Sequence, residues 1–442
     1  MAAAAPAPNA PDHVAVYADP AKYGLCLSGG ALHVEEVSLA AIAAAVGTPT
    51  YVYSSAHISA RHDELARACA SHPTLLCYAV KANSSQAVLR TLARRGAGAD
   101  IVSGGELTRA IAAGIPAAKI VFSGVGKLDS EIDAAISAGL RAINVESAEE
   151  LLRVATRARA LGIKVAVALR VNPDIDPDTH PYLATGLRES KFGVAMAEAE
   201  ALALTAAAMP ELTLVGLACH IGSQIAEAAP FLAAFERLRG LVLRLRERGV
   251  RLKQLDLGGG LGIAYTGEEP TLDVAGFGAA VTAAARSLEL ELVLEPGRFF
   301  VGNAGVLLTR VIGRKRGEAH NFAIVDAAMN DLIRPALYGA YHPIVPVSQA
   351  ASGRPLLRAD VVGPVCECGD FLGLGRLLPW PEPGELLAVL GAGAYGMAMA
   401  STYNSRPLAA EVLVKGDAFA VTRPRRTIEA MIADEQTPEW LV

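Results

Sequence analysis

The sequence predicts an α/β protein, in which a (β/α)8 TIM-like barrel is joined to a second, all-β domain of barrel or sandwich type. From about residue 48, short apolar or β-branched runs alternate with alanine-rich amphipathic stretches. This alternation is typical of parallel strands joined by right-handed crossovers. Eight such strands follow a lead-in strand, and eight is the number that closes this barrel. After about residue 298, short β-rich runs separated by Gly/Pro turns indicate the β domain. An open, doubly wound sheet is the competing architecture.

The elements are expected in the following order along the chain. Runs of mostly apolar and β-branched residues predict a lead-in strand at 49–53 and barrel strands at 75–80, 99–103, 119–123, 142–146, 165–171, 214–220, 254–257 and 292–295. Apolar residues at helical spacing predict helices such as 105–113, 148–161 and 231–248. Later strands are expected at 305–311, 321–325, 385–390 and 418–422. We assign residues 48–297 to the barrel, 13–47 with 298–442 to the β domain, and 1–12 to a disordered tail; residues 14–37 are expected to be short strands.

Composition excludes several classes of protein. Of 442 residues, 52% are hydrophobic and 19% charged, so the chain can bury a large core and is not globally disordered. The net charge of −5 and the absence of a lysine/arginine-rich patch argue against nucleic-acid binding. No apolar run reaches the roughly 18 residues of a membrane span. Six cysteines in a long chain suggest a reduced cytoplasm, and Cys366 and Cys368 lack the second Cys/His pair of a metal site.

Polar residues and glycines stand at the ends of the expected barrel strands. In barrel enzymes the chemistry lies at these carboxyl ends. A lysine that closes a buried strand is a candidate nucleophile toward a carbonyl, although a lone lysine there could simply extend its amine to solvent. Read in order, the ends carry Lys81, Asp100 with Ser103, Ser123 with Gly124, Glu146, Arg170 with Asn172, His220, Gly258 to Gly260, and Glu295.

Four of these features together favour pyridoxal phosphate as the cofactor. Lys81 supplies an amine, and the glycine run from Gly258 supplies backbone N–H groups for a phosphate. Glu295 could keep a pyridine nitrogen protonated, which makes the ring an electron sink, and His220 could stack on a flat ring. Taken singly, the glycines could form a tight turn, Glu295 an ion pair, and His220 a core histidine.

Long motifs spread from about residue 48 to 407 resemble a known family. The chain is similar to the barrel-fold pyridoxal-phosphate enzymes that include alanine racemase and the basic amino acid decarboxylases, and within them most similar to the diaminopimelate decarboxylases. The resemblance is carried by Tyr78-Ala79-Val80-Lys81-Ala82-Asn83, Lys191-Phe192-Gly193, His220-Ile221-Gly222-Ser223-Gln224, Glu295-Pro296-Gly297-Arg298, Arg334-Pro335-Ala336-Leu337-Tyr338, Cys366-Glu367 and Tyr403-Asn404-Ser405-Arg406-Pro407.

The resemblance implies roles around the cofactor. Lys81 would hold pyridoxal 5′-phosphate as a Schiff base, Glu295 would pair with the ring nitrogen, and His220 would stack on the ring. Asp100 and Arg170 match positions around the cofactor and the lysine. The phosphate would be held by Gly259, Gly260 and the backbone of Gly297 and Arg298, helped by Ser223 and Tyr395. Pro296 is also expected to bind the cofactor.

The resemblance also implies how the substrate is recognised. Arg298 and Arg334 would clamp a distal carboxylate, Tyr338 and Tyr395 would add hydroxyl groups, and Glu367 would pair with the distal ammonium. Ornithine and arginine have no distal carboxylate, so two arginines there would repel their cationic tails.

Cys366 matches the cysteine to which the family assigns proton delivery, whereas Cys368 stands where many relatives are expected to have serine. In the family the Cys366 loop reaches the neighbouring subunit's site, which implies a homodimer with shared active sites.

The implied activity is decarboxylation of meso-2,6-diaminopimelate to L-lysine and carbon dioxide, the last step of lysine biosynthesis, by a cytoplasmic carboxy-lyase without metal. Two alternatives stay open. One is a decarboxylase of the same fold acting on arginine, ornithine or carboxynorspermidine. The other is a non-catalytic homologue that binds partners.

Overall fold

The structure is a computed structural model that describes residues 10–175, 191–266 and 269–441. The chain divides into two compact units. The barrel unit comprises residues 58–263 and 270–300, and the β unit comprises residues up to 57, 264–269 and 301–442.

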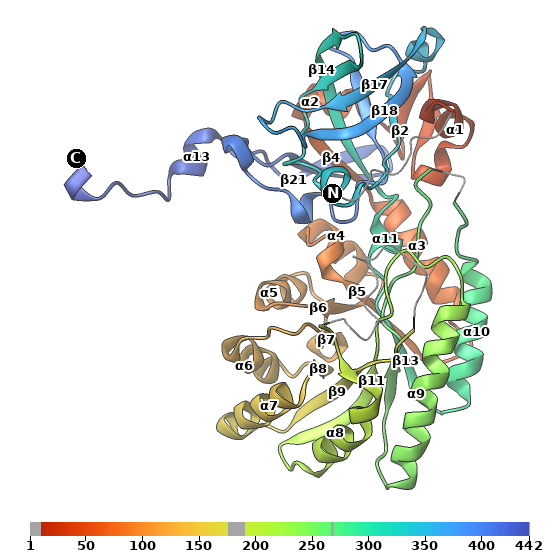
Figure 1. Ribbon diagram of the computed structural model, residues 1–442, viewed down its shortest axis with the longest axis vertical. Coiled ribbons are helices and arrows are strands. Elements are labelled where there is room, and N and C mark those ends of the chain that lie inside the picture. Colours follow the sequence, from red (N-terminus) through yellow and green to blue (C-terminus); the bar gives the residue numbers. More distant parts are fainter. Residues whose placement is uncertain (1–9, 176–190, 267–268, 442) are drawn as a thin grey trace. The chain divides into compact units, whose positions relative to one another are not determined.

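Eight parallel strands of the barrel unit form a closed ring. Each strand pairs with the next along the chain, and the last pairs with the first. The prediction of an eight-stranded barrel beside a separate sheet domain is therefore confirmed (Figure 1). The ring consists of β5(Thr74–Ala79), β6(Gly98–Ile101), β7(Ile120–Phe122), β8(Ala142–Val145), β9(Val165–Asn172), β11(Leu212–Ala218), β12(Gln254–Asp256) and β13(Glu291–Leu294). A short strand that was not predicted, β10(Val194–Ala195), pairs parallel with the end of β9.

Helices cover the outside of these strands (Figure 1). Each buries one stripe against the sheet; in α9 the stripe includes Phe231, whose ring meets Phe277 of α10 edge to face at 5.0 Å. Ser103 and Ser147 accept hydrogen bonds from the backbone N–H groups of Glu106 and Glu150 and so cap α5 and α7. The helices are α3(Ser55–Ala68), α4(Gln86–Ala93), α5(Gly104–Ala112), α6(Asp129–Ala138), α7(Ala148–Leu161), α8(Met196–Ala208), α9(Ala229–Glu247) and α10(Val274–Arg286).

The β unit is built on one large sheet with the order β18-β17-β15-β14-β4-β20-β21, to which β19 and β16 add through β14. A three-stranded sheet and α2(Leu39–Val46) pack on its core. The strands are β1(Cys26–Ser28), β2(Ala31–Val34), β3(Val37–Ser38), β4(Thr50–Ser54), β14(Gly305–Arg316), β15(Asn321–Val325), β16(Ile344–Pro346), β17(Leu356–Val362), β18(Phe371–Pro379), β19(Leu386–Val389), β20(Ala410–Lys415) and β21(Ala418–Arg423). Three short helices, α11(Arg298–Val301), α12(Arg334–Tyr338) and α13(Ile428–Ile432), complete this part of the chain.

The lead-in strand belongs to this sheet and not to the barrel, where we had assigned residues from 48 onward. β4 pairs antiparallel with β14 and parallel with β20. Its five side chains are all buried, because a central strand is covered on both faces. The boundary of the barrel unit therefore lies at residue 58.

The N-terminal segment also differs from the prediction. Residues 14–18, expected as strand, and Asp12, expected in the tail, form α1(Asp12–Ala18). The helix buries Val16, while Asp12 accepts a hydrogen bond of 2.8 Å from the backbone N–H of Ile344. Residues 1–9 of the predicted tail lie outside the described residues. No helix in the described part of the chain combines the length and apolar character that crossing a bilayer requires.

Candidate active site

Lys81 lies directly after β5, in the single turn Val80–Ala82. Its Nζ donates a hydrogen bond of 2.8 Å to Oδ2 of Asp100, the penultimate residue of β6. Asp100 is fully buried. The Lys81 side chain keeps 38% of its surface exposed. The amine is therefore held at the carboxyl end of the barrel by a desolvated carboxylate, and it does not simply extend into solvent.

Glu295 follows β13 and is almost completely buried. Burial raises the pKa of its carboxyl group well above the ordinary value, and the nearby charges of Asp100 and Asp256 raise it further, while Lys81 lowers it. The Glu295 carboxyl group therefore holds a proton more tightly than an ordinary glutamate does. A buried carboxyl group with high proton affinity suits a partner that brings its own positive charge, such as a pyridinium N–H.

The glycine run after β12 approaches its neighbours more closely than any side chain would allow. Gly258 adopts φ +70°, which favours glycine. A Cβ atom on Gly259 would lie 2.0 Å from the carbonyl oxygen of Glu295, and one on Gly260 would lie 2.1 Å from that of Gly222. Glycine is therefore required at these positions by the close approach of neighbouring backbone, and the loop presents its backbone without side chains, as phosphate-binding loops do.

His220 faces this loop. Its Nδ1 accepts a hydrogen bond of 3.1 Å from the backbone N–H of Gly259, so Nδ1 carries no proton and the ring orientation is fixed. Burial lowers the pKa of His220 well below its usual value, and the positive charges of Arg170 and Lys81 lower it further. The imidazole is neutral, which suits stacking on an electron-poor ring.

The segment after β13 packs directly on the turn that carries Lys81. The backbone N–H of Ala79 donates to the carbonyl of Pro296 at 3.1 Å, and a Cβ on Gly297 would lie 3.1 Å from the Cβ of Ala79. Arg298 is buried, and its Nη2 donates to Oγ of Ser223 at 3.3 Å.

Arg170 lies near the end of β9 and is paired over 3.0 Å with Glu146, which directly follows β8. Glu146 also accepts backbone hydrogen bonds from Gly124 at 2.6 Å and Gly193 at 3.2 Å. The guanidinium group lies 4.8 Å from the centre of the Phe192 ring. Sequence reasoning noted Glu146 without giving it a role; the structure makes it the acceptor that ties three strand ends together.

The barrel unit therefore brings together Lys81, Asp100, Arg170, His220, Ser223, Gly259, Gly260, Glu295, Pro296, Gly297 and Arg298. Asp256 is a further buried group in this cluster that sequence reasoning missed. The signal was present, because an acidic residue ends the strand that precedes the glycine run.

The other predicted site residues lie in the β unit. Arg334 begins α12 and is buried; its Nη1 donates to Nε2 of His342 at 2.8 Å, and its guanidinium group lies 5.1 Å from the Tyr265 ring centre. Nδ1 of His342 in turn donates to the carbonyl of Leu390 at 2.8 Å, which leaves Nε2 as the acceptor. Arg334 is therefore held in a defined orientation.

Cys366 and Glu367 lie on an exposed loop. The backbone N–H of Cys366 donates to Oδ1 of Asn404 at 2.8 Å, which ties the loop to the Tyr403–Pro407 motif. Tyr338 ends α12 and is partly buried, as is Tyr395, whose φ of +57° is unusual for a side-chain-bearing residue.

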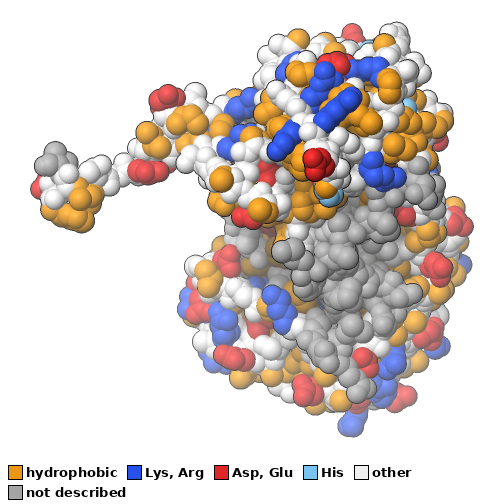
Figure 2. Space-filling view, turned by 45° about the horizontal axis from the view of Figure 1, so that its top comes forward, with side chains coloured by type: hydrophobic (Ala, Val, Ile, Leu, Met, Phe, Trp, Pro, Cys, Tyr) orange, Lys and Arg blue, Asp and Glu red, His pale blue; other side chains and the backbone are white. Residues whose placement is uncertain are grey.

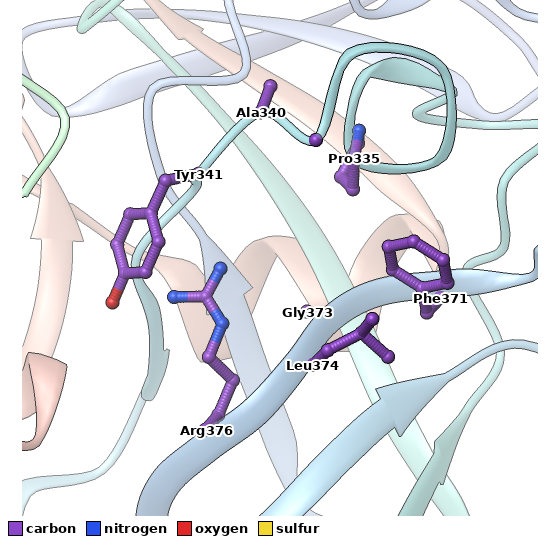
Figure 3. Close-up of a pocket in the computed structure, with 8 residues that line it drawn as sticks. Pro335, Ala340, Tyr341, Phe371, Gly373, Leu374 and Arg376 are labelled. Carbon is purple, nitrogen blue, oxygen red and sulfur yellow. The ribbon is translucent and has the colours of Figure 1, made fainter. Parts of the chain in front are cut away.

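Figure 3 shows a small cavity beside α12, lined by Pro335, Gly339, Ala340, Tyr341, Phe371, Gly373, Leu374 and Arg376. Its volume of about 20 Å³ accommodates a single water molecule, not an amino acid. The guanidinium group of Arg376 lies 3.6 Å from the centre of the Tyr341 ring, which explains why this side chain is buried here.

Comparisons with known proteins identify the family of the chain. A family model described as "Pyridoxal-dependent decarboxylase, pyridoxal binding domain" matches residues 55–302. Diaminopimelate decarboxylase of Pseudomonas aeruginosa is 53% identical over 405 residues, which cover 91% of this chain and 96% of the relative. The corresponding protein of Zymomonas mobilis is 45% identical and covers 94% of this chain and 99% of its own.

Solved structures are similar over the same range. The crystal structure of diaminopimelate decarboxylase from Helicobacter pylori complexed with L-lysine is 40% identical with a TM-score of 0.84, and covers 87% of this chain and 96% of its own. The crystal structure of diaminopimelate decarboxylase from M. jannaschii is 35% identical with a TM-score of 0.89, and covers 95% of this chain and 99% of its own.

Proposed function

Because the chain belongs to the diaminopimelate decarboxylases within the pyridoxal-dependent decarboxylase family, we propose that it converts meso-2,6-diaminopimelate to L-lysine and carbon dioxide, with pyridoxal 5′-phosphate as cofactor. The observation that carries the proposal is the pair formed by Lys81 and the buried Asp100 at the mouth of the barrel, close to the carboxyl group of Glu295. This reaction would be the last step of lysine biosynthesis.

The described residues fit the cofactor. The glycine run presents backbone without side chains, as a phosphate-binding loop does, and the buried Glu295 carboxyl group has a raised pKa that suits a pyridinium partner. When bound, pyridoxal phosphate supplies an aldehyde for amines and a ring that accepts the electron pair left by carbon dioxide. Lys81 would hold the aldehyde carbon, Glu295 the ring nitrogen and His220 the ring face. The phosphate would be held by Gly259, Gly260, Gly297 and Arg298, with Ser223 and Tyr395, while Pro296 would contact the cofactor beside them.

The side chains of the barrel unit position and transfer protons at defined atoms. Asp100 holds Nζ of Lys81 in place and can accept a proton from it when the amine must act as a nucleophile. Glu146 keeps the Arg170 guanidinium group fixed beside the site. Neutral His220 cannot repel a cation, because its pKa lies well below 6.5.

We assign recognition of the substrate's far end to Arg298, Arg334, Tyr338, Tyr395 and Glu367. A guanidinium group offers paired donors to a carboxylate, and Arg334 is buried and oriented by His342. This charge pattern fits an amino acid that carries both a carboxylate and an ammonium group at its distal end.

We also propose that the protein acts as a cytoplasmic homodimer whose sites are shared. Cys366, which would deliver a proton to the α-carbon, is exposed in the single chain, as expected if its loop serves a neighbouring subunit. The C-terminal arm after β21 carries exposed apolar side chains, which are typical of a protein–protein contact: Ile428, Ile432, Trp440 and Leu441 (Figure 2).

The test is carbon dioxide release by the purified protein from meso-diaminopimelate, measured beside ornithine and arginine, with and without pyridoxal phosphate. We expect release from diaminopimelate alone, and only with the cofactor. Lys81→Ala should abolish turnover. Faster release from ornithine or arginine would replace the substrate assignment, whereas full activity of Lys81→Ala would overturn the proposed chemistry.

A further inference from the structure

Asp256 lies beside Glu295 in a position that no proposed role explains. It ends β12 and is fully buried, and it pairs in register with Val293, two residues before Glu295. The hydrogen bonding continues past both strands: Leu257 N–H donates to Val293 at 3.1 Å, and Glu295 N–H donates to Gly258 at 2.7 Å. The two acidic residues are thus held side by side by backbone structure.

The two oxygens of Asp256 have different environments. Oδ1 accepts the backbone N–H of Gly258 at 2.8 Å and so anchors the first residue of the glycine run. Oδ2 is buried and receives no hydrogen bond from any described N–H or hydroxyl group. The Glu295 carboxyl group lies within hydrogen-bonding reach of Asp256. Two ionised carboxylates cannot form a hydrogen bond, so this contact requires one proton between them.

Groups from the neighbouring strands determine which oxygen keeps the proton. Asp100 of β6 and Lys81 face Glu295, whereas Arg170 of β9 and Asp100 face Asp256. The buried thiols of Cys77 and Cys219 also face the pair; burial raises the pKa of each, so both thiols are neutral, and Arg141 acts on Cys77.

Burial raises the pKa of both carboxyl groups, and the hydrogen bond between them raises that of Glu295 and lowers that of Asp256, so the shared proton resides on Glu295.

We propose that Asp256 is a positioning residue that acts through Glu295. Its carboxylate makes Glu295 a stronger base, so Glu295 keeps a proton in the cofactor-free protein and holds the N–H of the pyridinium nitrogen when the cofactor is bound. Its Oδ1 fixes the glycine loop through the N–H of Gly258, which couples the phosphate end of the site to the ring-nitrogen end. This inference rests on the proposed function, because the pyridinium nitrogen belongs to pyridoxal phosphate.

Two substitutions separate these two actions. Asp256→Asn keeps an oxygen that accepts the Gly258 N–H but removes the charge, and its amide can donate to an ionised Glu295. Asp256→Ala removes the charge and the acceptor together. Asp273→Asn is the matched control, because Asp273 also accepts a glycine N–H, that of Gly276 at 3.0 Å, at an exposed position on α10.

The first measurement is infrared spectroscopy of the full-length protein freed of cofactor, followed over pH. The C=O band of protonated Glu295 is assigned by its loss in Glu295→Gln. In the parent we expect this band at pH 7, and we expect Asp256→Asn to lower its titration midpoint by about one pH unit or more. Asp273→Asn should leave it unchanged. A midpoint unaltered in Asp256→Asn overturns the proposal.

The second measurement is equilibrium binding of pyridoxal phosphate. We expect Asp256→Ala to weaken binding by about tenfold, as loss of one charge-assisted hydrogen bond would, and Asp256→Asn to weaken it several-fold less. Equal losses in both variants would overturn the loop-anchoring action. If Asp256→Asn does not fold, the parent protein alone provides the test: a Glu295 C=O band that is already lost when the pH is raised to about 5 refutes the shared proton.

The infrared measurement needs neither turnover nor cofactor. A protein that binds no pyridoxal phosphate but shows the shifted Glu295 band would refute the proposed function and leave the role of Asp256 at Glu295 standing. Normal decarboxylation with an unshifted band would do the reverse.

Discussion

At the scale of single residues, desolvation determines the character of the site. Asp100 is fully buried, and its Oδ1 receives no hydrogen bond from the described residues, so the Lys81 ammonium group is the partner that makes its charge tolerable. The same pair keeps the amine within reach of an incoming aldehyde. Burial of Glu295 and His220 shifts their pKa values in the directions that leave both side chains neutral.

We expect Asp100→Asn to reduce kcat on the order of 100-fold, because the amide cannot accept a proton from Nζ as a carboxylate can. Cofactor affinity should change much less, since the hydrogen bond of Asp100 goes to Nζ of Lys81. Steady-state kinetics and pyridoxal phosphate titration measure the two effects. Asp273→Asn serves as control, and a kcat equal to that of the parent would contradict the role.

Arg334→Lys tests the proposed clamp. The substitution keeps the positive charge but loses the paired donors of the guanidinium group. We expect KM for diaminopimelate to rise about tenfold or more, the equivalent of one lost charge-assisted hydrogen bond, with unchanged cofactor affinity. A proportional loss of cofactor binding would show that Arg334 supports the fold of the β unit and not the substrate.

At the scale of elements, the loop after β12 links three strand ends. Its glycines contact the backbone after β13 and the loop after β11, so any added atom must displace main chain and not a flexible side chain. The function of the loop therefore depends on the absence of side chains.

Gly259→Ala should destabilise the protein by about 1–3 kcal/mol and strongly weaken cofactor binding, because its Cβ would lie 2.0 Å from the Glu295 carbonyl. Gly126→Ala, in the loop after β7, is the matched control, since a Cβ there has no neighbour within 4 Å. Thermal unfolding and pyridoxal phosphate titration report both effects. Equal behaviour of the two variants would contradict the close packing.

At the scale of the whole molecule, buried acids outside the site make stability depend on pH. Asp331 of the β unit is buried, which raises the pKa of its carboxyl group to about 6 from an ordinary 3.8. The folded state then binds this proton more tightly than the unfolded state does. Its contribution to stability is therefore full below about pH 4 and is lost as pH rises to about 6.

Asp331→Asn should remove this dependence, because an amide does not titrate over this range. The hydrogen bond is kept, since the amide oxygen can still accept the N–H of Ala328. Relative to the parent, the free energy of unfolding of the variant should increase by about 2 kcal/mol between pH 4 and pH 7. Denaturant titrations at both pH values measure the change, with Asp273→Asn as control. A difference between variant and parent that stays constant over this range would refute the raised pKa.

Much of the barrel and its site could be predicted, because the signals are local. A buried run followed by one polar residue marks both a strand and its functional end, as with Lys81 and Glu295. The membership of β4 could not be predicted, because its partners β14 and β20 lie more than 250 residues away. The role of Asp256 was also hidden, since it depends on the register between β12 and β13 and not on its own motif.

The central place of β4 affects how the protein is made. This strand emerges from the ribosome early, yet its hydrogen-bonding partners, residues 305–308 and 410–414, are synthesised only after the complete barrel unit. During translation the barrel sequence can close while β4 remains an unpaired, apolar strand that is prone to aggregate. A chain truncated before residue 410 would leave one edge of β4 permanently open, so nascent-chain chaperones should bind this segment.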